Sequence, residues 1–126
     1  DAHHASTADL AGRAWFVQKD PLLAKVVSTP KRGCTLEDAQ GNRRNVVWSN
    51  TNRLLGIEGY DGVKTGTTSA AGNCLVASGR RGNDRIIIAI LGAATSDGRY
   101  LDARNLFRWA WNQRNNKDSS ATAGGR

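Results

Sequence analysis

The segment YDGVKTGTTSAAGNCLVASGRRGNDRIIIAIL, residues 60–91, decides the fold because it holds three runs with strand character separated by turn formers. The run over about 61–67 is short and bounded by glycine, and residues 73–78 are apolar and β-prone. Residues 85–91 contain an unbroken Ile-Ile-Ile-Ala-Ile-Leu, which is typical of a strand buried on both faces. The sequence of residues 79–84 suits a hairpin loop. We therefore predict three adjacent antiparallel strands, with the first at the sheet edge.

A helix is predicted after these strands, over about residues 98–112, where Ser96 or Asp97 provides an N-cap. Its apolar residues recur at helical spacing, so they form one face that must cover a sheet. They are Ala103, Leu106, Phe107, Ala110 and Trp111.

Two further helices are predicted before the strands. Ser6 is followed three positions later by Asp9, which fits a helix over about 7–18 that begins with a capping box. Asp20 then provides a capping carboxylate for a second, shorter helix with Pro21 at its first position, and the next proline ends it. Helices together with an antiparallel sheet predict an α/β fold of the α+β type.

Two segments lack a strong periodic pattern. Turn formers and charged residues dominate residues 31–45, so we expect loops there and at most a weak hairpin around residues 46–48. The segment 117–126 is rich in Ser, Thr, Ala and Gly, which predicts a disordered tail.

Composition limits the class of protein. The chain has 126 residues, of which 39% are apolar and 23% charged, and this suits one compact domain. The longest apolar run is far shorter than the roughly 18 residues that a membrane-spanning helix needs. Two cysteines, Cys34 and Cys74, are too few for a disulfide scaffold, and a bond between them stays open. His3 and His4 have no acidic partner in phase, so we expect no metal.

The net charge of +7 is concentrated in the second half of the chain. Residues 1–63 carry 8 basic and 7 acidic groups, whereas residues 64–126 carry 10 and 4. This excess suits an anionic partner, which charge alone leaves open as a nucleic acid, an anionic polymer or a small carboxylate. The chain begins at Asp1 without a basic and an apolar leader region, so we interpret its start as a cut end.

The triplet Lys64-Thr65-Gly66 is the strongest candidate for a functional site. It places an ammonium and a hydroxyl beside a backbone that a ligand can approach closely, because glycine has no Cβ. This arrangement suits a ligand that carries a carboxylate. An isolated triplet of this kind is more often an exposed strand end before a turn, so its flanking residues decide the interpretation.

The flanking residues resemble those of the D-alanyl-D-alanine carboxypeptidases of the low-molecular-mass penicillin-binding type. The resemblance covers about residues 1–112. Its motifs, in the family's order and approximate spacing, are Ser6–Ala11, Trp48–Leu55, Asp61–Thr68, Ala71-Gly72, Leu75–Ser78, Leu91–Ala93 and Arg99.

The resemblance implies the serine β-lactamase and DD-peptidase transpeptidase-like fold, with residues 1–116 as the C-terminal part of the catalytic domain. Of the family's three motifs, S-x-x-K with the nucleophile, S-x-N and K-T-G, only the third occurs here in context. Residues 28–31 spell S-T-P-K, but the proline prevents the helical turn that would bring Lys31 beside Ser28. We expect the nucleophile in an N-terminal part, upstream or on a second polypeptide. Without that part, an apolar surface of this chain should be uncovered.

The resemblance also implies roles for individual residues. Lys64 would supply positive potential near the nucleophile, and the N–H of Thr67 would form half of an oxyanion hole. Thr65, Gly66 and Arg99 would bind the substrate, with Arg99 near the terminal carboxylate.

The implied activity is a serine-type D-Ala-D-Ala carboxypeptidase of the bacterial periplasm or cell envelope. It would act through an acyl-enzyme on peptidoglycan stem peptides, would react with β-lactams and would need no cofactor. One alternative is a catalytically dead peptidoglycan-binding remnant. Another is a basic nucleic-acid-binding module, although the sequence has no helix-turn-helix spacing, zinc finger or aromatic stacking motif.

Overall fold

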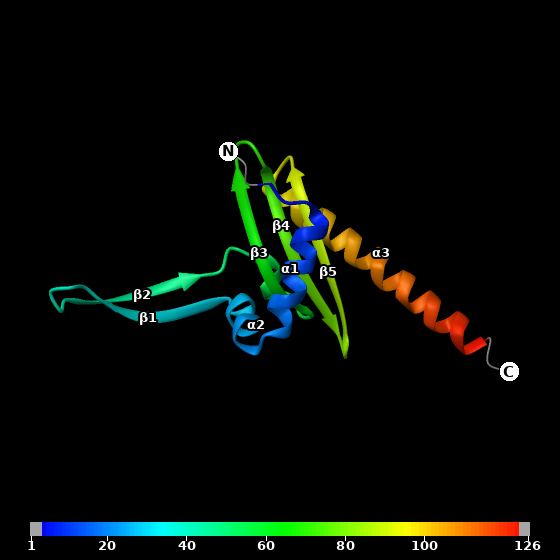
Figure 1. The fold of residues 1–126 in the computed structure, drawn as a ribbon, viewed down its shortest axis with the longest axis horizontal. Coiled ribbons are helices and arrows are strands. Elements are labelled where there is room, and N and C mark those ends of the chain that lie inside the picture. The colour runs from blue at the N-terminus through cyan, green and yellow to red at the C-terminus, as the bar shows by residue number, and fades with distance from the viewer. Residues whose placement is uncertain (1–3, 124–126) are drawn as a thin grey trace.

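A computed structural model describes residues 4–123 of the chain. The β1–β2 hairpin projects away from the remainder, in which three strands are flanked by helices (Figure 1). The elements are α1 (Thr7–Lys19), α2 (Pro21–Ser28), β1 (Lys31–Glu37), β2 (Arg43–Ser49), the 3-10 helix η1 (Arg53–Gly56), β3 (Tyr60–Thr68), β4 (Gly72–Arg81), β5 (Asp84–Ala93) and α3 (Ser96–Ala123).

The main sheet has the strand order β3-β4-β5 and is antiparallel throughout, which confirms the predicted fold class and the edge position of β3. The predicted loop over residues 79–84 is too long. Arg80 pairs with Arg85 and Arg81 with Asp84, so that only Gly82 and Asn83 connect β4 to β5. Gly82 has a φ of 57°, which favours glycine in a two-residue hairpin turn. The polar residues within 79–84 are therefore mostly at the ends of β4 and β5, which extend into solvent.

Helices cover both faces of this sheet. Because alternate residues of β4 point in opposite directions, this strand contributes side chains to the core on each face. Leu75 and Ala77 pack toward α3, whereas Val76 packs on the α1 side with Ala14. The larger cluster comprises Leu54, Leu75, Ala77, Ile88, Ile90, Tyr100, Ala103, Phe107 and Trp111.

Helix α3 differs from its prediction in length and in its buried face. Leu106 is 43% exposed, and Tyr100 lies in the core with Phe107, so the buried stripe is narrower than predicted. The helix also continues through residues 117–123, where the sequence predicts a disordered tail; residues 124–126 lie outside the described part. Within residues 4–123 no helix combines the length and the apolar character needed to cross a bilayer.

The segment predicted as loops forms the β1–β2 hairpin instead. Most of its side chains are exposed, so it has no apolar alternation from which strands could be predicted. Polar cross-strand contacts stabilise it: the Thr35 hydroxyl donates to Asn45 Oδ1 at 2.9 Å, and Arg43 lies 2.6 Å from Glu37. Cys34 in this hairpin is a free thiol, as is Cys74 in β4.

Both predicted helix starts are confirmed. Ser6 and Asp9 form the capping box of α1, and their hydrogen bonds hold the pKa of the Asp9 carboxyl below its ordinary value. At the start of α2, one Asp20 oxygen accepts hydrogen bonds from the N–H groups of Leu22 and Leu23 at 2.9 and 3.0 Å. Capping therefore defines the corner between α1 and α2.

Replacing Asp20 with alanine should lower the free energy of unfolding by about 1 kcal/mol, because two N–H groups at the start of α2 lose their acceptor. Equilibrium urea unfolding measures this change. Asp102→Ala, an exposed substitution on α3, is the control and should change stability by less than about 0.5 kcal/mol. Equal midpoints for Asp20→Ala and the parent protein would show that the cap contributes nothing.

Candidate active site

β3 is an outer strand of the sheet, and on it Lys64, Gly66 and Thr67 are exposed whereas Thr65 is buried. We call the free edge of the strand from Lys64 to Thr67 the KTG edge. One Arg99 amino group lies 3.2 Å from the carbonyl oxygens of both Gly66 and Cys74, which face one another across β3 and β4. One nitrogen can reach both oxygens only if they point between the two strands, because outward carbonyls of an opposed pair would lie on opposite edges. Because successive residues of a strand direct their N–H and C=O groups to opposite sides, Thr65 and Thr67 present theirs at the free edge.

The Lys64 ammonium supports this assignment of the backbone groups. The side chain is exposed, and its Nζ donates a hydrogen bond to the carbonyl oxygen of Thr65. That oxygen is directed away from β4 and accepts from an ammonium instead. The KTG edge thus carries a positive charge directly beside backbone groups that a ligand could pair with.

Thr65 points its hydroxyl toward the loop that connects β2 to η1. Thr65 is only 7% exposed, and its Oγ1 lies 2.5 Å from Oγ1 of Thr51. The sequence does not predict Thr51 as a neighbour of the triplet, although Thr51 lies within the Trp48–Leu55 motif. The Asn-Thr-Asn triplet within that motif was the only available signal, because short polar residues before a 3-10 helix usually form caps and turns.

Gly66 and Thr67 complete the KTG edge. A Cβ placed on Gly66 would meet no atom within 4 Å, so the space beside this residue is open. The Thr67 hydroxyl accepts a hydrogen bond from Arg99 at 3.1 Å and donates to Asn73 Oδ1 at 3.3 Å. The side chain of Thr67 is therefore used within the protein, while its backbone N–H faces the free edge.

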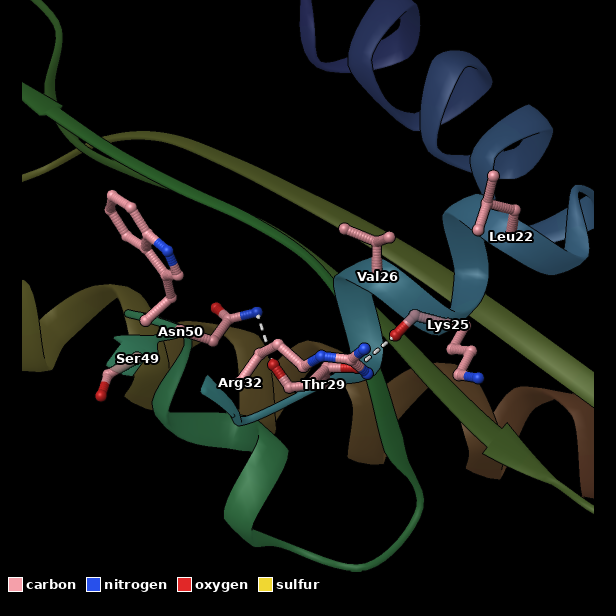
Figure 2. Close-up of a pocket in the computed structure, with 8 residues that line it drawn as sticks. Leu22, Lys25, Val26, Thr29, Arg32, Ser49 and Asn50 are labelled. Atoms are coloured by element: carbon pink, nitrogen blue, oxygen red, sulfur yellow. Dashed lines mark hydrogen bonds between the residues drawn. The ribbon is translucent and has the colours of Figure 1, made fainter. Parts of the chain in front are cut away.

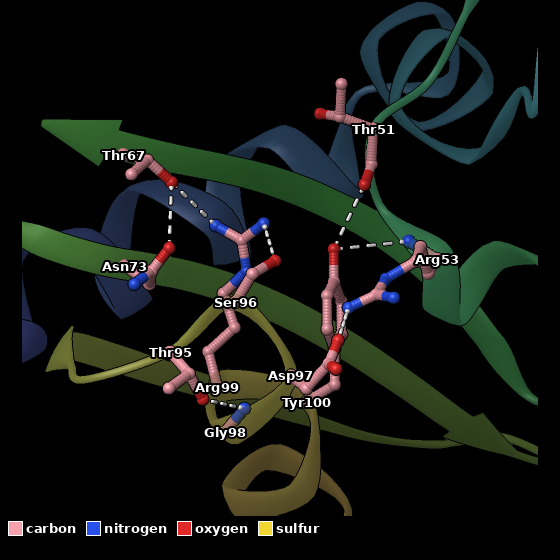
Figure 3. A network of polar contacts seen from close by, with 10 residues as sticks. All are labelled: Thr51, Arg53, Thr67, Asn73, Thr95, Ser96, Asp97, Gly98, Arg99 and Tyr100. Atoms are coloured by element: carbon pink, nitrogen blue, oxygen red, sulfur yellow. Dashed lines mark hydrogen bonds and ion pairs between the residues drawn. The ribbon is translucent and has the colours of Figure 1, made fainter.

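Arg99 extends from the first turn of α3 to the end of β3 (Figure 3). It is 7% exposed, and besides its bonds to β3 and β4 it donates to Ser96 Oγ at 3.2 Å. Its Nε is buried and has no hydrogen-bond partner among the residues that the structure describes. Arg99 therefore contacts Gly66 and Thr67 of the KTG edge, with its guanidinium against the strand backbone, and its predicted role at the ligand carboxylate stays a prediction.

Two asparagines fix the Thr51 loop, and one of them, Asn52, ties it to β3. Asn52 is buried; its Nδ2 donates to the carbonyl oxygen of Gly62 at 2.9 Å, and its Oδ1 accepts from the N–H of Leu54. Asn50 Oδ1 accepts from the N–H of Asn52 at 3.0 Å. The loop is consequently fixed by side chains on both sides of Thr51.

The alternative S-x-x-K residues lie on different elements. Ser28 ends α2 and its hydroxyl donates to the carbonyl oxygen of Lys25, whereas Lys31 begins β1. The described residues contain no group of three or more His, Cys, Asp or Glu side chains that could hold a metal ion. His4 is exposed, and His3 lies outside the described residues.

A separate groove of about 440 Å³ lies between α2 and the base of the hairpin (Figure 2). Leu22 and Val26 line it from α2 and Trp48 from β2, with the charged side chains of Lys25 and Arg32 beside them. Large apolar side chains are exposed here and on α1, in agreement with the uncovered apolar surface predicted for this chain. The most exposed are Phe16 at 73% and Leu22 at 70%.

Comparison with known proteins assigns this arrangement to a family. The family model described as D-alanyl-D-alanine carboxypeptidase matches residues 1–95. The chain belongs to the D-alanyl-D-alanine carboxypeptidase family. Among this family's members, DacF of Bacillus subtilis is 36% identical over 116 residues, which are 90% of this chain and 28% of that protein. DacD of Escherichia coli is 41% identical over 70 residues, or 56% of this chain and 16% of that protein.

Solved structures extend this family assignment to the fold. A mutant of the Streptomyces K15 DD-transpeptidase superposes with a TM-score of 0.82 at 29% identity, covering 87% of this chain and 43% of that one. Penicillin-binding protein D2 of Listeria monocytogenes, in its cefotaxime-bound form, gives a TM-score of 0.58 at 32% identity and covers 36% of that chain. The chain thus has the DD-peptidase fold and spans less than half the length of these relatives.

Proposed function

We propose that this chain supplies one wall of the active site of a serine-type D-Ala-D-Ala carboxypeptidase. The observation that carries the proposal is the KTG edge, where an ammonium, a hydroxyl and the outward N–H groups of Thr65 and Thr67 lie together. An extended peptide can add to such an edge as a further strand. The terminal D-Ala-D-Ala of a peptidoglycan stem peptide offers the matching backbone groups and a carboxylate, and a β-lactam would occupy the same place.

The reaction would proceed through an acyl-enzyme. A serine hydroxyl of the N-terminal part attacks the carbonyl carbon of the penultimate D-Ala and transfers its proton to a neighbouring lysine. The C–N bond then breaks, and the terminal D-Ala leaves after its amine takes up a proton. Water subsequently attacks the ester carbonyl, which releases the shortened peptide and restores the serine.

The residues of the KTG edge would act on charges that develop during this reaction. The N–H of Thr67 would donate to the oxygen of the tetrahedral intermediate, and the Lys64 ammonium would stabilise negative charge near the nucleophile. The hydroxyl of Thr65 would donate to the terminal carboxylate of the substrate. Arg99, which holds the ends of β3 and β4, would add positive potential from behind the strand.

The nucleophile must come from an N-terminal part of the catalytic domain, in the same precursor or as a second polypeptide. Two features support a partner of that kind: β5 is an outer strand of the sheet, and the groove beside α2 exposes apolar side chains. We propose that the assembled enzyme works in the bacterial envelope, where its substrate is found.

Labelling with a fluorescent penicillin tests this function. The assembled protein should form a covalent, denaturation-resistant adduct, whereas this chain alone should form none. Salt-dependent binding of the chain to duplex DNA, with no penicillin adduct in the assembled protein, would favour the basic nucleic-acid-binding module. Binding of peptidoglycan by the assembled protein without any adduct would identify a remnant that has lost catalysis.

A further inference from the structure

Tyr100 connects α3 to the loop that lies against the KTG edge (Figure 3). Its hydroxyl donates to the carbonyl oxygen of Thr51 at 3.0 Å and accepts from the N–H of Arg53 at 3.4 Å. The residue is 8% exposed, and the guanidinium groups of Arg53 and Arg99 lie 4.5 and 5.1 Å from the centre of its ring. The ring is therefore held firmly, and its hydroxyl fixes the backbone at Thr51.

Binding of a carboxylate would fix which of the two hydroxyls, Thr51 or Thr65, donates the hydrogen bond between them. An ionised carboxylate only accepts hydrogen bonds, so the Thr65 hydroxyl must donate its proton to the ligand. The 2.5 Å contact between the two hydroxyl oxygens then requires Thr51 to donate to Thr65. A hydroxyl that accepts one hydrogen bond becomes a better donor in the next, so Thr51 would both orient and polarise Thr65.

We propose that Tyr100 is a positioning residue for carboxylate recognition, acting through Thr51 on the hydroxyl of Thr65. The inference rests on the proposed function, because it takes Thr65 as the contact to the ligand carboxylate. The Tyr100 hydroxyl sets the position of the Thr51 backbone, and the Thr51 side chain holds the Thr65 oxygen with its proton free for the ligand. Arg99, the preceding residue on α3, holds the next two residues of the same strand, Gly66 and Thr67.

The test compares two probes, benzylpenicillin and its methyl ester, in the protein assembled from both parts of the catalytic domain. Second-order acylation rate constants are measured for each. Thr65→Val should slow acylation by benzylpenicillin about 10- to 100-fold, since it removes a hydrogen bond to a charged group. Tyr100→Phe, which keeps the ring, should slow it about 3- to 10-fold, and both variants should react with the ester within about twofold of the parent rate.

Conservative and matched variants separate positioning from general stability. Thr51→Val should behave like Tyr100→Phe, and Thr51→Ser, which keeps the hydroxyl, should restore the parent preference for benzylpenicillin. Tyr60→Phe is the control, because its ring packs at 5.0 Å against Phe107 in the same core and should leave both rates unchanged. The double variant Thr65→Val with Tyr100→Phe should lose no more than Thr65→Val alone.

The outcomes distinguish this inference from the proposed function. Loss of the benzylpenicillin preference in Thr65→Val but not in Tyr100→Phe overturns the positioning role and leaves the proposed function intact. Equal slowing of both probes by Tyr100→Phe also overturns it, since that is the effect of a merely structural residue. If Thr65→Val reacts with both probes at the parent rates, Thr65 does not contact the ligand carboxylate, and the positioning role of Tyr100 is overturned as well.

Discussion

Replacing Lys64 with alanine is expected to slow acylation of the assembled protein about 10²- to 10⁴-fold, both by a β-lactam and by a D-Ala-D-Ala peptide. Removing one preorganised hydrogen-bond donor from an active site costs about 10²- to 10³-fold, and a full charge beside the nucleophile can contribute more. The ammonium lies on the KTG edge beside the outward carbonyl of Thr65, where it would stabilise charge near the nucleophile. Lys64→Arg should also be impaired, because a planar guanidinium does not replace a compact ammonium.

Lys31→Ala is the matched control for this experiment. Lys31 is exposed at the start of β1 and is the lysine of the S-T-P-K sequence, so an unchanged rate would also eliminate that sequence as a catalytic motif. Acylation is followed by stopped-flow fluorescence or by quenched labelling. If Lys64→Ala reacts with both substrates at the parent rates, the Lys64-Thr65-Gly66 triplet is an ordinary strand end and not part of an active site.

Replacing Phe107 with alanine should lower the free energy of unfolding by about 3–5 kcal/mol, a large part of the roughly 5–15 kcal/mol that stabilises a domain. Phe107 is 2% exposed and packs on Gly79, where a Cβ would lie only 2.8 Å from its ring. Its ring also meets Tyr60 edge to face. Because the chain is close-packed at this point, the vacated space cannot be refilled without moving α3.

Leu106→Ala gives the matched control, one residue earlier on the same helix. Leu106 is 43% exposed, so its truncation should cost far less than that of Phe107. Urea unfolding of the assembled protein, followed by circular dichroism, compares the two variants. Similar losses would mean that α3 does not pack on the sheet through its Phe107 face.

The elements that could be predicted are those with local signals. Ser6 and Asp20 mark helix starts through their own side chains, and the apolar run in β5 requires burial wherever it occurs. The β1–β2 hairpin gave no such signal, because its pairing depends on contacts such as that between Thr35 and Asn45, which lie on opposite strands with mostly solvent-facing side chains. Strand pairing of this kind is a non-local property that short-range periodicity does not encode.

The candidate site divides in the same way. Lys64, Thr65 and Gly66 are adjacent in sequence and could be identified as a motif. The partners that orient them are distant: Thr51 lies 14 residues before Thr65, and Tyr100 lies 49 residues after Thr51. Likewise, the bonds of Arg99 to strand carbonyls depend on how α3 packs against the sheet, which the local sequence around Arg99 does not encode. Such contacts become visible only in the folded chain.

Mapping the acylated residue by mass spectrometry tests the central claim most directly, namely that this chain forms a wall of a site whose nucleophile lies elsewhere. The protein is reacted with penicillin with and without this chain, digested, and searched for a peptide that carries the acyl group. We predict a single modified serine in the N-terminal part, acylated only when this chain is present. A modified serine within this chain, such as Ser28, or equal acylation in its absence would contradict the claim.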